Sequence, residues 1–296
     1  MVGREVNVVD LGAAWVQDDS PLGVLHTRER PGGGRWLRRC GVIDEEFIET
    51  VVAACRRLPT AEAVNLGGSR ARGDHRPDSD WDFAVYYRGD IDVGVFEELG
   101  WTGRVFRPFE WGRVMYGGAV FDLDGRHFDI HYRNLEVVEH WSKEASEGRF
   151  EVHILGFHLA GIPTYMLTGE LAISRALWGE LPRPDYPDAL RRSAPPVWLE
   201  RANRELEYAS YWAASENPVS CAGALAKVAL QASHARLAHR GIWALNEKRM
   251  LDWAGLTGLY DRFAALGSSC EELNAAIDDV KATVAAVEAE VSESAA

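Results

Sequence analysis

The sequence has no long apolar run. A membrane-crossing helix needs about 20 consecutive apolar residues, and the 296 residues contain no such stretch. The first segment, MVGREVNVVDLGAAW, carries Arg4, Glu5 and Asp10 where a secretory signal would be apolar throughout. We therefore expect a soluble, cytoplasmic protein without a membrane partner.

Cysteine is scarce and unpaired in the sequence. The four cysteines are Cys40, Cys55, Cys221 and Cys270. None of them forms a C-x-x-C pair, so the spacing indicates neither a zinc ribbon nor a disulfide framework.

Positive charge is in deficit. Lys and Arg number 32 against 45 Asp and Glu, which gives a net charge of -13. A broad grip on nucleic acid depends on Lys and Arg at phosphates, so bulk nucleic-acid binding is not expected. A small substrate fits this charge better, in particular a cationic one, and the charge leaves oligomer formation open.

The chain reads as three regions. Residues 1–40 have little periodicity, and the glycines of RPGGGRW lack the Lys-Ser/Thr of a phosphate loop, so this region is interpreted as an extension. A helix is predicted from Asp44 as N-cap to Leu58, followed by α/β sequence up to about residue 140. Residues 141–296 show helical spacing, and the prolines between Pro182 and Pro196 are expected to break any helix crossing them. The predicted fold class is α+β, a mixed sheet with flanking helices followed by a mostly helical region.

Two carboxylates stand at the start of a predicted strand, residues 81–87. Asp80 and Asp82 are two apart, so period-two alternation points both to one face. Holding two anions side by side is unfavourable unless a cation lies between them, and Mg²⁺ prefers carboxylate and phosphate oxygens. The pair therefore predicts a metal site.

The turn before this strand, GGSRARG, supplies groups for an anion. Gly67 and Gly68 permit close backbone approach, and Ser69 offers a hydroxyl at a predicted helix start, where amides bind anions. Arg70 and Arg72 add positive charge. Neighbouring positions on a helix point in different directions, so one of the two is expected to reach a phosphate, and Arg72 is favoured.

A hairpin with its turn at Asp124-Gly125 is predicted to supply a third acid. In that register Asp122 pairs with His127 and Val120 with Asp129. Alternation then places four polar residues on one face: Asp122, His127, Asp129 and His131. Asp129 is preferred as the third acid because it is mid-strand, with Asp122 as the substitute, and it would either complete a two-metal site or act as a base.

Two further readings concern residues outside this acid set. His127, Asp129 and His131 resemble a two-His, one-carboxylate metal set, but three ligands along one strand span too far to surround one ion. His131 is expected instead to contact the nucleotide or the acceptor. Lys227, inside the apolar helical run GALAKVAL, either snorkels to solvent or reaches a phosphate.

The string GGSRARGDHRPDSDWDFAV, with HFDIH after it, resembles the signature of the DNA polymerase β-like nucleotidyltransferase superfamily. In that signature a Gly-Ser turn precedes Asp-x-Asp, and a third acid lies on a later strand between apolar residues. The size and the helical second half are similar to small bacterial aminoglycoside nucleotidyltransferases and their uncharacterised relatives. The resemblance implies a catalytic domain at residues 41–140 and an acceptor-binding domain at 141–296.

The resemblance also implies the chemistry. A nucleoside monophosphate, by default AMP from ATP, would pass to a hydroxyl of a small molecule such as an aminoglycoside-like antibiotic, with release of pyrophosphate. Two Mg²⁺ ions would be held by Asp80, Asp82 and Asp129, and the triphosphate by the Gly67–Ser69 turn with Arg72 and Lys227. In some relatives the base comes from the second domain, which here leaves Glu200, Glu205 and Glu207 open. The alternatives are the same transfer to a protein or RNA partner, as in toxin–antitoxin relatives, and an inactive nucleotide-binding scaffold.

Overall fold

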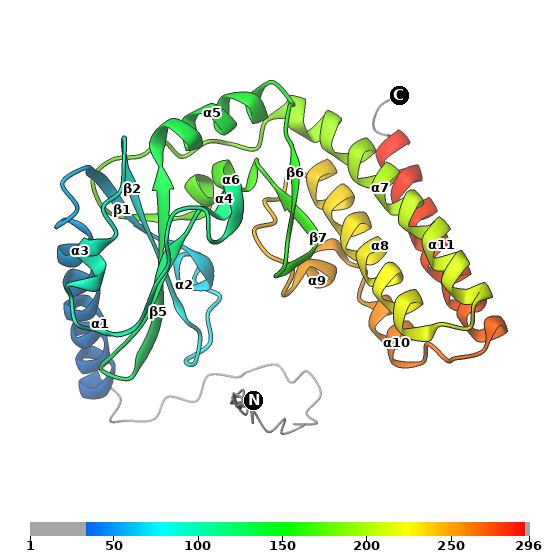
Figure 1. The fold of residues 1–296 in the computed structure, drawn as a ribbon, viewed down its shortest axis with the longest axis horizontal. Helices are drawn as coiled ribbons and strands as arrows, with labels where there is room; N and C mark the ends of the chain where they lie inside the picture. The colour runs from blue at the N-terminus through cyan, green and yellow to red at the C-terminus, as the bar shows by residue number, and fades with distance from the viewer. Residues whose placement is uncertain (1–33, 294–296) are drawn as a thin grey trace, which may run out of the picture. The chain divides into compact units, whose positions relative to one another are not determined.

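The structure, a computed structural model, describes residues 34–293, with side chains from Asp44 onward. The chain divides into two compact units, Met1–Glu46 and Phe47–Ala296. Residues 1–33, most of the predicted extension, lie outside the described residues, as does the Cys40 side chain. The second unit holds the sheet and the long helices drawn in Figure 1.

The first helix, α1, spans Gly34–Cys55 and begins earlier than the predicted start. Asp44 therefore lies inside the helix and is not its N-cap, because the preceding Leu-Arg-Arg segment contains good helix formers that continue the same helix. The predicted apolar stripe is confirmed, since its members are all buried: Phe47, Val51, Ala54, Cys55 and Leu58.

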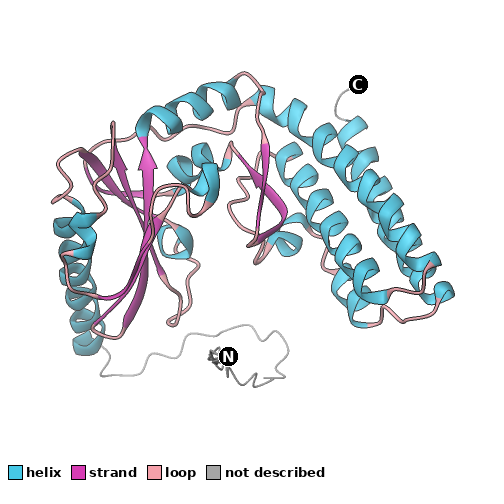
Figure 2. Cartoon of the chain, in the orientation of Figure 1, coloured by secondary structure: helices cyan, strands magenta, loops and turns pink. Residues whose placement is uncertain are grey.

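The second unit contains a six-stranded mixed sheet with the strand order β3-β4-β5-β2-β1-β8. Figure 2 draws the strands in magenta. Its strands are β1 (Ala61–Leu66), β2 (Trp81–Tyr87), β3 (Thr102–Val105), β4 (Gly118–Leu123), β5 (Arg126–Asn134) and β8 (Arg175–Trp178). The β2–β5 pair is parallel and the other pairs are antiparallel. The sheet extends past residue 140, where the sequence places the end of the catalytic domain, because β8 returns to pair with β1.

The hairpin of β4 and β5 has the predicted register. Asp122 pairs with His127, and Val120 pairs with Asp129. Along β5 the side chains of Phe128, Ile130 and Tyr132 are fully buried. Period-two alternation therefore sends the intervening polar residues of β5 to the opposite face.

Aromatic rings fill the core beneath the apolar face of the sheet. The Phe47 ring packs edge-on against Trp81 and Phe128, with ring centroids 5.2 and 5.3 Å apart. Edge-to-face pairs of this kind add to the stabilisation from burial itself. This core holds β2 and β5 together. It thereby fixes the positions of the side chains on the opposite face of these strands.

Short elements connect and flank the strands. They are α2 (Gly68–Arg72), α3 (Gly94–Glu97), α4 (Gly112–Met115), α5 (Leu135–Ser146), the two-stranded β6 (Val152–Leu155) and β7 (His158–Pro163), and α6 (Met166–Ile173). Strand β3 ends at Val105, and Phe109, a few residues later, has a positive φ of 69° that a regular strand does not accommodate.

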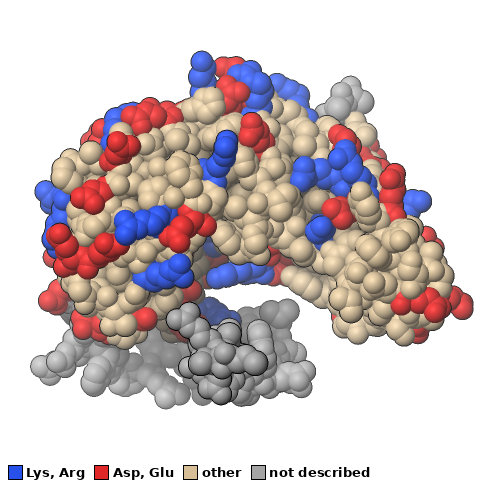
Figure 3. Space-filling view, viewed as in Figure 1, with Lys and Arg blue, Asp and Glu red and all other residues tan. Residues whose placement is uncertain are grey.

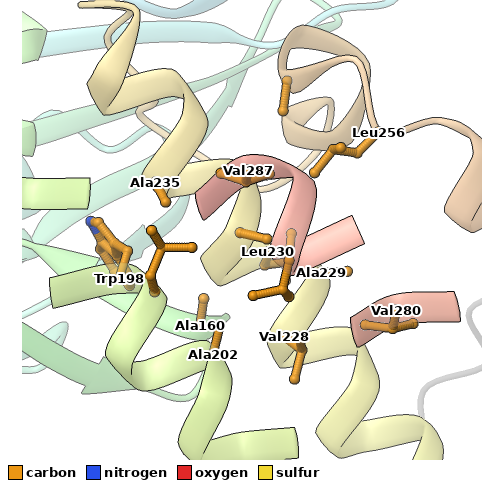
Figure 4. Close-up of a cluster of buried hydrophobic side chains, with 14 of the residues drawn as sticks. Ala160, Trp198, Ala202, Val228, Ala229, Leu230, Ala235, Leu256, Val280 and Val287 are labelled. Atoms are coloured by element: carbon orange, nitrogen blue, oxygen red, sulfur yellow. The ribbon is translucent and has the colours of Figure 1, made fainter. Parts of the chain in front are cut away.

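Long helices make up the rest of the second unit. They are α7 (Asp188–Ala214), α8 (Pro218–His239) and α11 (Cys270–Glu293), with the short α9 (Met250–Ala254) and α10 (Gly258–Ala264) between the last two. Their core is formed by small and branched side chains around Trp198, several of which Figure 4 shows pointing toward one another. The indole nitrogen of Trp198 donates a hydrogen bond to the Tyr165 hydroxyl at 2.9 Å, which ties α7 to the segment before α6.

The expectation that the prolines end any helix crossing them is wrong for α7. Pro195 and Pro196 lie inside this helix. Their fixed φ is compatible with a helix, and the burial of Pro195 and Trp198 offsets the lost backbone hydrogen bonds. Tertiary packing outweighs the local penalty here.

The visible face of the molecule in Figure 3 carries acidic and basic side chains interspersed, without one dominant basic patch. Within residues 34–293, no helix combines the length and the apolar character that crossing a membrane requires.

Candidate functional site

A cavity of about 240 Å³ opens at the polar face of β2 and β5. Its polar lining includes the residues that the sequence singles out in the turn and on the two strands: Gly67, Gly68, Arg72, Asp82, Asp129 and His131. The other wall comes from later in the chain, with Phe157 and His158 at the start of β7, and Leu245, Asn246 and Lys248 ahead of α9. The cavity therefore joins the sheet to segments beyond residue 140.

Asp82 and Asp129 form the floor of this cavity. They are direct partners in the parallel β2–β5 pairing, so the two half-buried carboxylates leave the sheet side by side. A ligand atom from each of Asp82, Asp129 and His131 lies within 4.8 Å of the others. Asp80 precedes β2, is exposed and does not line the cavity.

The two acids on the cavity floor have raised pKa values because they are buried and lie near other negative charges. The pKa of Asp82 is raised to about 6, first by burial and then by the charge of Asp129, with smaller contributions from Asp80 and Glu170. The pKa of Asp129 is also raised, by burial and by Asp80. Lys248 counters both shifts. A cation bound at these carboxylates would relieve the repulsion.

The turn of Gly67 and Gly68 passes directly over Asp82. The Gly67 amide donates to the Asp82 carbonyl at 2.6 Å. Gly68 has a φ of +60°, and a Cβ placed on it would lie 1.8 Å from the Asp82 carboxylate. Only glycine leaves space there, so the turn and the carboxylate are fitted to each other. Ser69 is half-buried but is not part of the cavity lining.

The two arginines of α2 have different positions. Arg70 donates to the carbonyls of Ser79 and Asp80, and its guanidinium lies 4.0 Å from the centre of the Trp81 ring, so it fastens the loop that leads into β2. Arg72 lines the cavity, and its Nε lies 3.3 Å from Asp74. The structure thus brings Arg72 to the site and leaves Arg70 in a supporting position.

Lys227 is not brought to the cavity. Its ammonium lies 3.5 Å from the Glu205 carboxylate, between α8 and α7. Of the other acids left open by the resemblance, Glu200 pairs with Arg204 at 2.5 Å, and neither Glu200 nor Glu207 lines the cavity. The lysine at the cavity is Lys248, which sequence reasoning missed because its loop sequence, NEKRM, has no periodicity to orient it.

Asp122 and His127 lie farther along the hairpin. The His127 Nδ1 is 3.2 Å from the Asp122 carboxylate, and both side chains are largely exposed. Neither lines the cavity, although they share its face of the sheet. Of the two candidate third acids, Asp129 lines the cavity and Asp122 does not.

A buried ion pair also borders the site and was missed in the sequence. Arg133, only 2% exposed, makes a two-pronged pair with Glu170 of α6, at 2.5 and 2.7 Å. The sequence does contain a signal for Arg133. The alternation that places Asp129 and His131 on one face of β5 also places Arg133 on that face. Glu170 is likewise a lone acid in an apolar helix.

A family model matches the part of the chain that contains strands β1 to β5. Residues 48–147, roughly a third of the chain, match the family model described as a nucleotidyltransferase domain. No curated protein sequence matches the chain. Among solved structures, a nucleotidyltransferase-like protein from Exiguobacterium sibiricum 255-15 is similar at 9% identity and a TM-score of 0.40, over 77% of this chain and 70% of that one.

Proposed function

We propose, from the match of residues 48–147 to the nucleotidyltransferase domain model, that this protein moves a nucleoside monophosphate from a triphosphate to a hydroxyl of a small molecule, with release of pyrophosphate. The observation that carries the proposal is the pairing of Asp82 with Asp129 on the floor of a cavity that Gly68, Arg72 and Lys248 also line. Carboxylates can hold the metal ion that accompanies a triphosphate, and cationic side chains beside them can bind its phosphates.

The donor set fits a divalent cation. Two carboxylates converge on the floor, and the pKa of Asp82 is raised by its burial and then by the charge of Asp129, which a bound cation would offset. Asp82, Asp129 and Asp80 would hold Mg²⁺. Because Asp129 lies close to Asp82, we assign Asp129 the role of a metal ligand rather than that of a base. A bound Mg²⁺ would neutralise and orient the phosphates.

The remaining parts position the triphosphate and the acceptor. Arg72 and Lys248 would neutralise the phosphates and the departing pyrophosphate. Gly68 keeps the backbone close to Asp82 and free of side-chain atoms. The acceptor oxygen would attack the α-phosphorus as the bond to the β-phosphate breaks, and the hydroxyl proton would pass to solvent or to a carboxylate of the site.

The acceptor would enter between the sheet and the later segments. Phe157, Leu245 and Asn246 supply that wall of the cavity, which supports a role in acceptor selection for residues beyond 140. The net charge of -13 favours a cationic acceptor, and an aminoglycoside-like molecule is the candidate. ATP is the default donor.

The direct test is pyrophosphate release. The protein would be incubated with Mg²⁺, each of the four ribonucleoside triphosphates and a panel of aminoglycosides and neutral sugars, with Asp82→Asn in parallel. Release that needs both acceptor and wild-type Asp82 supports the proposal. Release absent across the panel removes these acceptors, and label transferred from nucleotide to protein or RNA in a cell extract would redirect the transfer to a macromolecule.

A further inference from the structure

Three alternate residues of β5 face the cavity side of the sheet: Asp129, His131 and Arg133. The side chain of Arg133 is held in place by several partners. Besides its pair with Glu170, the Arg133 guanidinium donates through Nη1 to the Met115 carbonyl at 2.9 Å and to the Tyr132 carbonyl at 3.1 Å. A buried guanidinium with this many fixed partners is a rigid donor to anything beside it.

His131 lies beside that donor. The Arg133 Nη2 is 3.3 Å from the His131 Nδ1. A guanidinium has only N–H groups to offer, so Nδ1 must accept this hydrogen bond with its lone pair. An imidazole that accepts at Nδ1 carries its ring proton on Nε2. Arg133 thereby sets the tautomer of His131.

The tautomer decides what His131 can do at the cavity that it lines. With the proton on Nε2 and the Nδ1 lone pair engaged by a cation, neither nitrogen is available to bind a metal, although His131 lies within 4.8 Å of Asp82 and Asp129. Magnesium also favours oxygen ligands over imidazole. The proximity of His131 to the acids therefore does not make it a ligand.

Resting on the proposed function, we infer that His131 is a substrate-positioning residue whose Nε2–H donates a hydrogen bond to an oxygen of the bound triphosphate or acceptor, with Arg133 fixing the tautomer. The metal is left to the carboxylates. Loss of one hydrogen bond to a charged oxygen corresponds to about 10- to 100-fold in binding or rate.

The first experiment reads the tautomer in the free protein. Long-range nitrogen–proton correlation spectra of nitrogen-15-labelled protein at pH 7.5, with His131→Gln used to assign the signal, should show His131 protonated at Nε2 and bare at Nδ1. A proton found on Nδ1 overturns the inference and leaves the proposed function intact.

The second experiment asks whether His131 is a metal ligand or only a hydrogen-bond donor. It measures the binding of Mn²⁺ alone by electron paramagnetic resonance. His131→Ala and His131→Gln should bind Mn²⁺ within about twofold of wild type, whereas Asp82→Asn should lose tenfold or more. A loss in His131→Ala equal to that in Asp82→Asn overturns the inference. Failure of wild type to bind Mn²⁺ would count against the metal-dependent function and not against the tautomer.

Turnover then identifies the oxygen. His131→Gln keeps an N–H donor near the Nε2 position and should retain most activity, while His131→Ala should lose about 10- to 100-fold. A rise in KM for the triphosphate assigns the bond to a phosphate, and a rise in KM for the acceptor assigns it to the hydroxyl. Equal activity of His131→Ala and wild type would overturn the role as donor.

Discussion

Asp82 and Asp129 are directly opposite each other on the parallel strands β2 and β5, and both carboxylates leave the same face of the sheet. The aromatic core under the other face holds this pairing in place. Apolar packing on the other face of the sheet thus keeps the two anions together. A cation that binds between them is favoured because it relieves their repulsion.

Removing one of the two carboxylates should make the metal-free protein more stable and less active. In Asp82→Asn the repulsion with Asp129 and the cost of burying the charge both disappear. Because the pKa of Asp82 is raised to about 6 from 3.8, the free energy of unfolding at pH 7.5 in the presence of chelator should rise by about 1–3 kcal/mol. Nucleotidyl transfer should fall on the order of 100-fold or more.

Urea unfolding and pyrophosphate release measure these two effects. Asp78→Asn is the control, since Asp78 is exposed and pairs only with Arg76 among the described contacts. It should change neither quantity appreciably. A metal-free Asp82→Asn protein that is less stable than wild type would contradict the repulsion argument.

Gly68→Ala should disable the site through a clash. Its Cβ would lie 1.8 Å from the Asp82 carboxylate, so the carboxylate must move. The positive φ of 60° adds about 1–2 kcal/mol of backbone strain. Mn²⁺ affinity and transfer should both drop at least about tenfold.

Gly73→Ala supplies the matched control for that clash. Gly73 has a φ of 79°, and its added Cβ would meet nothing within 4 Å. Gly73→Ala should lose only the stability that the positive φ costs, Gly68→Ala should lose at least as much, and Mn²⁺ binding should fall only in Gly68→Ala. Equal Mn²⁺ affinity in both would show that the Gly68 approach to Asp82 has no part in the site.

The Arg133–Glu170 pair should be costly to break on one side only. Glu170→Ala leaves a guanidinium with 1% of its side chain exposed and no carboxylate partner, which should lower the free energy of unfolding by about 3–5 kcal/mol. Replacing both residues, as in Arg133→Met/Glu170→Met, should restore most of that stability because no buried charge remains. Urea unfolding of the single and double variants checks this, and a double variant as unstable as Glu170→Ala would contradict it.

His234 should make the protein sensitive to acid. Burial and the neighbouring His158 lower the pKa of His234 to about 3, and its ring stacks on Trp198 with centroids 4.1 Å apart. Between the ordinary pKa of 6.5 and about 3, the unfolded chain binds a proton that the folded protein does not. Stability contributed by neutral His234 is therefore complete above pH 6.5 and falls as the pH drops, by up to about 1.4 kcal/mol per pH unit.

The measurement is the free energy of unfolding of wild type and His234→Phe from pH 7 to pH 4. Phenylalanine preserves a ring against Trp198 without a titrating group. The difference between the two proteins should shift in favour of the variant as the pH falls. Parallel curves would mean that His234 keeps its ordinary pKa in the fold.

The sequence by itself determined the local parts of the site. The spacing of two residues places Asp129, His131 and Arg133 on one face of β5, and the Asp124-Gly125 turn sets the register that pairs Val120 with Asp129. The glycines of the turn and Asp-x-Asp with the later acid were enough to identify the domain that residues 48–147 match. These features depend on neighbours in the chain, and short-range periodicity encodes them.

Only the tertiary structure decided which distant groups meet there. The parallel pairing of β2 with β5 sets Asp82 against Asp129, and the return of the chain beyond residue 140 brings Lys248 and Glu170 to the cavity while Lys227 is held at Glu205. The prolines inside α7 show the same limit, since burial against the helical core overrides a local signal that would end the helix. Long-range packing fixes these positions, and no periodicity within a segment reports which distant segment will cover it.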